Sequence, residues 1–459
     1  MSTFPGNSKL ELDRFLQSIQ ELESVNPVVR TGKVTRVTGP VLESNGPLAS
    51  IGDICHIQAR SDKEPILAEV VGFRDNKVLM MPFGEMDGIQ PGSQVITEGR
   101  PLQINMGFSL MGRVLNSLGK PIDGLGPING DCLTPLKAAP PHPMRRMRIS
   151  KRFHTGVRAL DTFIPCGIGQ RLGIFAGSGV GKSTLLGMIA GNAEAEVNVI
   201  ALIGERGREL REFIERDLSE EALAKSIVVV ATSDEPPIMR LKGAYTAMAI
   251  AEHFRDQGMK VMLMMDSVTR FAMAQREVGL STGELPATKG YPPSVFAELP
   301  RLLERAGAGE TGSITGLFTV LVEGDDLNDP IADHVRSILD GHIVLSRDLA
   351  IRNHYPAIDV LQSVSRLSGD LNQQEHVSWI DLARECMAEY HQHKDIITLG
   401  AYKVGTNQEI DRAISVRPAL NLFLRQGRDE SSYWQENIRS LKQIMSQEAS
   451  PKKLERQAV

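Results

Sequence analysis

The chain has 459 residues, of which 41% are hydrophobic and 23% charged, and its formal net charge is −5. This length exceeds that of one ordinary hydrophobic core, so we expect two or three domains of a soluble globular protein. The weakly acidic balance argues against a nucleic-acid binder, and no apolar run approaches the length of a membrane span.

The cysteines and histidines carry no metal or redox pattern. Four widely separated cysteines lack the spacing of a metal or disulfide motif, so we expect reduced thiols in the cytosol. Ten histidines show no ligand spacing either. The first residues do not form a basic, apolar leader, and we therefore expect a cytoplasmic protein that reaches a membrane only through its partners.

Residues 9–25 predict an amphipathic helix. Its apolar stripe consists of Leu12, Phe15, Leu16, Ile19 and Leu22. The stripe either packs on its own domain or binds a partner, and the residues leave both open. We assign residues 1–27 to an N-terminal segment that contains this helix, because the sequence pattern changes after residue 27.

Residues 28–101 predict a small β-barrel or sandwich. Short β-branched runs alternate with Gly, Pro and Asn, which is typical of many short strands. Asp75 and Asn76 mark a hairpin turn between two of these runs.

Residues 102–370 predict an α/β core with a mainly parallel sheet, because strand patterns alternate with helical ones. Within it, "RLGIFAGSGVGKSTLLGMIAGN" (171–192) passes from an apolar strand through glycines to a helix. It matches the phosphate-binding pattern G-x-x-x-x-G-K-[S/T], except that Ala176 stands at the first position. A glycine-rich turn without a ligand is disfavoured, because Gly-Lys-Ser lies at the required strand-to-helix junction.

The chemistry of this loop predicts a nucleotide bound with Mg²⁺. Glycines let backbone N–H groups turn toward phosphates, and the start of the helix adds positive potential. Lys182 can reach the β and γ phosphates, and the Ser183 hydroxyl can ligate Mg²⁺. The predicted nucleotide-binding residues are Gly177, Ser178, Gly179, Val180, Gly181, Lys182, Ser183 and Thr184.

Two further strand ends carry acids. The apolar run Val261–Met265 ends at Asp266, which suits an aspartate that holds Mg²⁺ through water, although many strands end in Asp. Glu205 follows the β-rich run 197–203, and a glutamate there can polarise the attacking water. Arg206 and Glu209 would support it. From spacing alone, a surface salt bridge explains this charged segment equally well.

Residues 371–459 are mostly helical in pattern and end in a polar, charged stretch. The predicted architecture is therefore a barrel (28–101), a RecA-like P-loop domain (102–370) and a C-terminal helical domain (371–459).

The order of these domains resembles the catalytic subunits of rotary ATPases and their relatives, over about residues 28–427. "PAIDVLQSVSR" (356–366) matches that family's signature, and "GERGRE" (204–209) is similar to its glutamate loop. Three stretches, beginning at Val70, Leu110 and Val322, most resemble the ATPases of type III protein export, particularly the flagellar branch.

The resemblance implies an assembly and partners. Such proteins form homohexamers at the cytoplasmic base of an export apparatus, peripheral to the inner membrane. They hydrolyse ATP with Mg²⁺ to help unload and deliver export substrates. Their partners are the export gate, substrates, chaperones and a regulatory stator-like protein, which would bind the helix at 9–25. No nucleic acid is implied.

The resemblance also assigns roles to residues. Glu205 would activate water and Asp266 would support the metal, while Arg206 and Arg270 match arginines near the γ-phosphate. Tyr355 matches the aromatic residue that stacks on adenine, the alternative being a core aromatic. Arg366 matches the arginine that reaches a neighbour's nucleotide, the alternative being an intramolecular ion pair.

Other functions remain as alternatives. A virulence secretion ATPase shares the catalytic core. A rotary synthase or ion-pump subunit is disfavoured, because residues 401–407 lack the acidic run that faces the central stalk. An RNA-translocating hexamer would need a basic, aromatic strand face in the barrel. A scaffold that does not hydrolyse nucleotide is disfavoured by the pairing of Glu205 with Arg366.

Overall fold

The computed structural model describes residues 31–59, 64–322, 324, 326 and 329–446. The chain divides into two compact units, Met1–Leu102 and Gln103–Val459. The helix expected at 9–25 lies outside the described residues, and the domain limits proposed above stay predictions. Within those ranges, no helix is both long enough and apolar enough to cross a bilayer.

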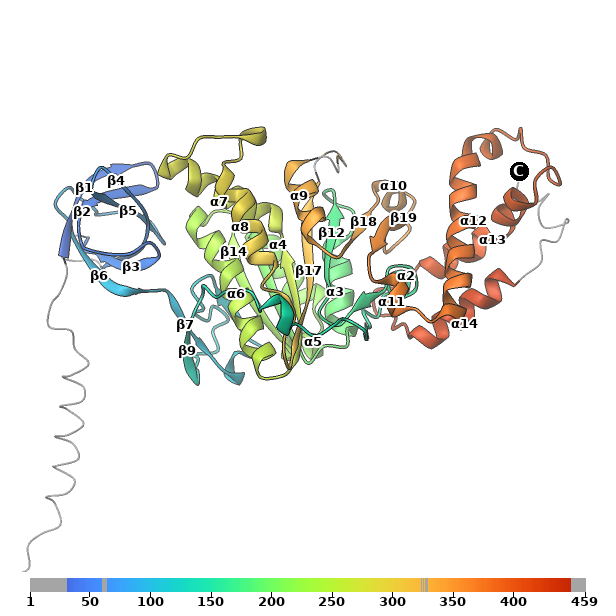
Figure 1. The fold of residues 1–459 in the computed structure, drawn as a ribbon, viewed down its shortest axis with the longest axis horizontal. Helices are drawn as coiled ribbons and strands as arrows, with labels where there is room; N and C mark the ends of the chain where they lie inside the picture. The colour runs from blue at the N-terminus through green and yellow to red at the C-terminus, as the bar shows by residue number, and fades with distance from the viewer. Residues whose placement is uncertain (1–30, 60–63, 323, 325, 327–328, 447–459) are drawn as a thin grey trace, which may run out of the picture. The chain divides into compact units, whose positions relative to one another are not determined.

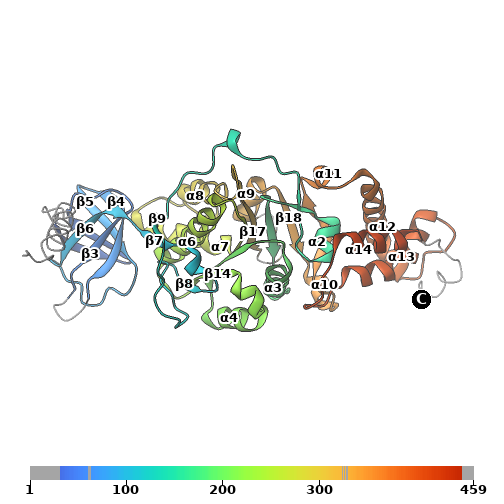
Figure 2. The same ribbon diagram turned by 90° about the horizontal axis from the view of Figure 1, so that it is seen from below.

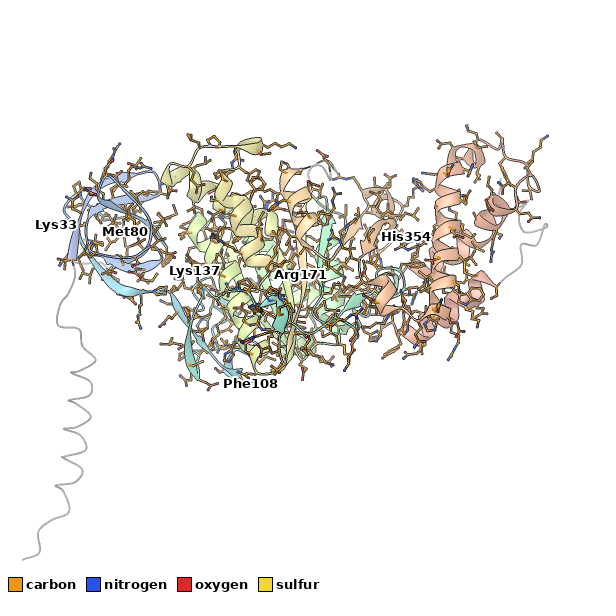
Figure 3. All side chains as sticks on the ribbon, viewed as in Figure 1. Lys33, Met80, Phe108, Lys137, Arg171 and His354 are labelled. Atoms are coloured by element: carbon orange, nitrogen blue, oxygen red, sulfur yellow. The ribbon has the colours of Figure 1, made fainter. Side chains whose placement is uncertain are left out.

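The first unit contains a closed antiparallel barrel, as the sequence predicted. In its described part the strands close in the order β1-β2-β5-β4-β3-β6. They are β1 (Thr31–Thr38), β2 (Val41–Asn45), β3 (Asp53–Ile57), β4 (Ile66–Arg74), β5 (Lys77–Pro82) and β6 (Gln94–Pro101). Inward side chains such as Leu42, Val70 and Met80 are fully buried (Figure 3). Asp75 and Asn76 have φ of 49° and 58°, which the predicted tight hairpin between β4 and β5 requires.

The second unit is built on a nine-stranded sheet within the described residues (Figure 1). Its order is β19-β18-β12-β17-β15-β13-β14-β8, with β16 paired to β17. The strands are β8 (Val114–Asn116), β12 (Arg171–Ala176), β13 (Val197–Glu205), β14 (Ser226–Thr232), β15 (Lys260–Asp266), β16 (Gly307–Ala308), β17 (Ser313–Leu321), β18 (Gly341–Leu345) and β19 (Ile358–Ser365). Two small pairs flank it: β7 (Gln103–Met106) with β9 (Cys132–Pro135), and β10 (Arg152–Phe153) with β11 (Cys166–Gly167).

Most neighbours in this sheet are parallel, and their register sets which side chains meet. Ala176 lies opposite Leu321 of β17 and Leu345 of β18, so these strands end at the same edge. Asp266 lies opposite Leu202, which places it close to the end of β13. The central strands are buried on both faces, which explains their continuous apolar runs.

Helices cover both faces of the sheet. In Figure 2, α6 to α9 lie on one face, and α3 and α4 lie on the other. The helices of this core are α2 (Arg158–Phe163), α3 (Lys182–Asn192), α4 (Gly207–Glu212), α5 (Glu220–Ala224), α6 (Pro237–Asp256), α7 (Val268–Thr282), α8 (Pro293–Leu303), α9 (Pro330–Ile338), α10 (Arg347–Ile351) and α11 (Ser368–Leu371). Several start at a capping side chain: Ser267 accepts from the Arg270 N–H, and Asp329 accepts from the N–H groups of Ile331 and Ala332.

The C-terminal segment is helical, as predicted, and packs beside β19 and α2. Its helices are α12 (Gln374–Thr398), α13 (Gln408–Leu424) and α14 (Trp434–Met445). Asp411 organises the loop between α12 and α13, because its carboxylate accepts from the Tyr402 hydroxyl at 2.9 Å and the Gly405 N–H at 2.8 Å.

Candidate nucleotide-binding site

The phosphate-binding loop lies between β12 and α3, where the sequence predicts it. Gly179 and Gly181 have φ of 77° and 89°, and α3 begins at Lys182. Ala176 closes β12 without a positive φ, so alanine causes no backbone strain at the first motif position. Burial differs along the loop: Gly177 and Val180 are buried, Ser178, Gly179 and Ser183 exposed, and Gly181, Lys182 and Thr184 intermediate.

Lys182 forms ion pairs with both predicted acidic residues, Asp266 and Glu205. Its Nζ lies 2.5 Å from Asp266 Oδ1 and 3.5 Å from Glu205 Oε1. Burial lowers the pKa of Lys182, but the two carboxylates outweigh it and leave that pKa above the ordinary value. The lysine therefore stays charged at the place where the loop would hold phosphates.

Asp266 is fixed by a residue that sequence reasoning missed. The Thr319 hydroxyl of β17 donates to Asp266 Oδ1 at 2.6 Å, and both side chains are buried. The signal was present as a hydroxyl within the apolar run of β17, but only the strand order places it beside β15. Thr319 thus orients the carboxylate that is proposed to hold the metal.

Glu205, at the end of β13, is largely shielded from solvent. Its Oε1 is buried and has no hydrogen bond within the described part of the chain, and Lys182 lies 3.5 Å from it in the longer of its two ion pairs. Burial raises the pKa of Glu205, Lys182 lowers it, and Asp266 raises it again, for a net increase. A raised pKa makes the carboxylate a better proton acceptor than an exposed glutamate.

This shift predicts a pH dependence. A base works in its ionised form, so activity should fall as pH drops through the raised pKa of Glu205. The acid limb of kcat/KM, which reports the free enzyme, is therefore expected at higher pH than an ordinary glutamate would give. Phosphate release measured across pH at MgATP concentrations well below KM checks this. A limb at or below the ordinary glutamate pKa would contradict the environment described for Glu205.

The supporting residues divide into two groups. Arg270 lies beside the acid loop: its Cβ would be 2.7 Å from a Cβ at Gly204, and its buried Nε has no hydrogen bond to any residue that the structure describes. Arg206 and Glu209 instead pair with each other at 3.4 Å on the surface of α4, with the Arg206 side chain 81% exposed. The structure brings only Arg270 toward Glu205.

Tyr355 lies at the phosphate-loop edge of the sheet, between β18 and β19. A Cβ at Gly181 would be 3.3 Å from Tyr355 Cε1, so the ring touches the last glycine of the loop. Tyr355 as a whole residue is 41% exposed, which disfavours the core-aromatic alternative. Its carbonyl accepts from the Gln426 N–H at 3.0 Å, which ties this turn to the end of α13.

Arg366 lies at the opposite edge. β19 runs antiparallel to β18 and Ser365 lies opposite Gly341, so β19 ends at the amino ends of the parallel strands. The exposed guanidinium donates only to the Arg336 carbonyl, at 3.3 Å, and has no ion pair among the residues that the structure describes. The intramolecular ion pair considered above is therefore not found there.

The residues at the loop fit ATP and Mg²⁺. Ser183 and Asp266 are oxygen donors, and Mg²⁺ is commonly held by one or two such groups together with substrate phosphates. The orphaned Glu205 Oε1 points to a missing hydrogen-bond partner, such as the attacking water. No protein-only group of three metal-ligating side chains occurs in the described ranges.

Two cavities lie near the edge of the sheet that carries the phosphate-binding loop. One of about 270 Å³ begins at Ala176 and Gly177 and extends along β18 to α10. The other, of about 260 Å³, lies between β19, α12 and α13 and is lined in part by His354 (Figure 3). Burial lowers the pKa of His354, and Arg425 lowers it further, which favours the neutral form of the imidazole.

The loop, the paired acids and the parallel sheet define a P-loop nucleoside triphosphatase. Family models match the barrel domain of the ATP synthase alpha/beta family at 34–99 and its nucleotide-binding domain at 156–365, and the C-terminal domain of the type III secretion ATPase EscN at 372–443. The chain belongs to the ATP synthase alpha/beta family and is an ATPase of the type III export group.

Individual relatives are similar over nearly the whole chain. The flagellum-specific ATP synthase of Bacillus subtilis is 53% identical over 93% of this chain and 98% of its own length. The type 3 secretion system ATPase of Xanthomonas euvesicatoria is 49% identical over 93% and 96%. The assembled EscN of enteropathogenic E. coli is 44% identical, with a TM-score of 0.86 over 90% of this chain and 100% of that one.

Proposed function

We propose that this chain is the Mg²⁺-dependent ATPase of a flagellar protein export apparatus, where it helps unload and deliver export substrates. The observation that carries the proposal is the cluster of Lys182, Glu205 and Asp266, joined by ion pairs at one edge of the sheet, in a chain whose relatives include flagellum-specific ATP synthases. Lys182 binds phosphate, Ser183 and Asp266 hold Mg²⁺, and Glu205 activates water.

The proposal includes a ring in which Arg366 acts in trans. Arg366 lies at the edge of the sheet opposite the loop of its own subunit, which supports a role at a neighbour's nucleotide. A solved relative, EscN, is described as assembled and also in complex with its central stalk EscO. A homohexamer of this chain would complete every site, because each copy carries both the loop and the arginine.

Location and partners form part of the same proposal. The ring would lie in the cytoplasm, peripheral to the inner membrane, and meet the export gate, substrates and chaperones there. A stator-like protein would bind residues 9–25, which lie outside the part of the chain described. No role in nucleic-acid binding is proposed.

Tyr355 is proposed to stack on the adenine base. Tyr355→Ala is expected to weaken ATP binding about tenfold, since base–aromatic stacking contributes about 1–3 kcal/mol. Tyr355→Phe keeps the ring and should bind ATP like the wild type. Titration with ATP and with inorganic tripolyphosphate, which lacks a base, separates stacking from phosphate binding. Equal losses for both ligands would contradict a contact with the base.

The flagellar assignment is tested by isolating the protein from its native cell with its neighbours. Co-purified rod, hook or basal-body proteins would support it, and Lys182→Ala should abolish Mg²⁺-dependent phosphate release in the same preparation. Virulence effectors and their chaperones would instead identify the second candidate, a virulence secretion ATPase, which the relative from Xanthomonas favours.

A further inference from the structure

The backbone that carries Arg366 is held by a bracket of buried and half-buried polar groups, Gln170, Arg171, Asp340 and Ser365, at the amino edge of the sheet. The Arg366 N–H donates to the Asp340 carbonyl at 3.0 Å. The fully buried Gln170 amide donates to the same carbonyl at 3.2 Å and to Ser365 Oγ at 3.1 Å. Ser365, the residue before Arg366 on β19, and Asp340, which lies across from Arg366, are therefore both held in place.

Asp340 is itself locked onto the strand that leads to the phosphate loop. Its carboxylate accepts from Arg171 Nε and Nη2, both at 3.2 Å, and from the Arg171 N–H at 3.1 Å. The Asp340 N–H returns a bond of 2.9 Å to the Arg171 carbonyl. Arg171, marked in Figure 3, also pairs with Glu304 at 2.7 Å, so its planar guanidinium forms ion pairs with two carboxylates.

The main chain and the side chain of Arg366 differ in how firmly they are held. The Arg366 backbone is fixed, whereas its guanidinium is exposed and, among the residues that the structure describes, donates a hydrogen bond only to the Arg336 carbonyl. β12 begins at Arg171 and ends at Ala176, so the bracket lies roughly 17 Å from the chain's own phosphate loop. A change in the bracket should therefore spare nucleotide binding in the same subunit.

We propose that Asp340, held by Arg171, is a positioning residue for Arg366 and sets the place from which that guanidinium reaches the nucleotide of the next subunit. The inference rests on the proposed role of Arg366 in trans. A misplacement of about 1 Å in such a group costs up to about a hundredfold in rate. Asp340→Asn retains the shape of the side chain and the main-chain carbonyl that accepts from the Arg366 N–H. It loses the negative charge that pairs with Arg171.

The expected result is a kcat about tenfold to a hundredfold lower for Asp340→Asn, with an unchanged Kd for ATP. Asp123→Asn is the matched control, because Asp123 makes a similar bidentate pair with Arg113, at 2.7 and 2.8 Å, beside β8 at the far end of the sheet. It should keep the wild-type kcat. Arg171→Lys keeps the charge but loses the fork, and it carries the same test if Asp340→Asn does not assemble.

Mixed rings distinguish positioning from a general structural role. Lys182→Ala subunits cannot hydrolyse ATP but carry an intact bracket and arginine. In a random equal mixture with Asp340→Asn, about a quarter of the head-to-tail interfaces would join an intact loop to an intact arginine. Activity should then rise well above that of either variant alone.

The outcomes separate the two proposals. The positioning role is overturned if Arg366→Ala mixed with Lys182→Ala regains activity but Asp340→Asn mixed with Lys182→Ala does not. Loss of ATP affinity in Asp340→Asn alone overturns it as well. If Arg366→Ala also fails to regain activity, the role of Arg366 in trans is itself wrong, and this inference falls with it.

Discussion

Replacing Arg366 by alanine is expected to lower kcat about a thousandfold while leaving the Kd for ATP nearly unchanged. An arginine that stabilises the transferring phosphoryl group contributes about 10³–10⁵ in rate. Arg366 lies at the sheet edge opposite the phosphate loop, so its loss removes nothing from nucleotide binding in its own subunit. Phosphate release and ATP titration on the same assembled preparation measure the two quantities.

Arg439→Ala is a suitable control for this variant. Arg439 is an exposed arginine on α14, and its removal changes the net charge equally. It should retain the wild-type kcat. If Arg366→Ala lost ATP affinity and turnover in parallel, Arg366 would be acting in its own subunit or in folding, and the trans assignment would be wrong.

Glu205→Gln is the second variant with a large expected effect. Amide nitrogen and oxygen cannot take a proton from water, and general-base catalysis contributes about 10²–10⁴ in rate, so kcat should fall by about a thousandfold. ATP binding should persist, because Lys182 and the loop are unchanged. The acid limb of the remaining activity should also disappear from the pH profile, since the group with the raised pKa is gone.

Glu212→Gln provides the comparison for this change. Glu212 pairs with Arg208 on the exposed face of α4, at 2.8 Å, and lies only seven residues further along the chain. Exposed pairs of this type contribute at most about 1 kcal/mol, so its kcat should be near wild type. Turnover by Glu205→Gln at more than about a tenth of the wild-type rate would assign water activation to another group.

The part of the site that the sequence predicted depends on local signals. The glycine loop, Lys182 and Ser183 occupy consecutive positions, and Glu205 and Asp266 each end a recognisable apolar run. Parallel strands then bring these ends to one edge without further information. Short strands and a turn at Asp75 likewise predicted a small barrel or sandwich, and the structure shows a closed barrel.

The remainder depends on pairings that a linear pattern does not encode. Thr319 meets Asp266 because β17 neighbours β15, and Asp340 meets Arg366 because β19 turns back along β18. The same reversal places Arg366 opposite the loop, which no spacing in the sequence reveals. The resemblance assigns both Arg206 and Arg270 to the γ-phosphate, whereas in the structure Arg206 faces solvent and Arg270 lies beside the acid loop.

The most direct measurement is phosphate release from rings that mix Lys182→Ala with Arg366→Ala subunits. Each variant alone has no complete site, whereas some interfaces of a mixed ring join an intact loop to an intact arginine. If ATP is cleaved between copies of this chain, the mixture regains hydrolysis at a level set by the ratio of the two variants. A mixture that forms rings and binds ATP but stays inactive at every ratio would contradict the account.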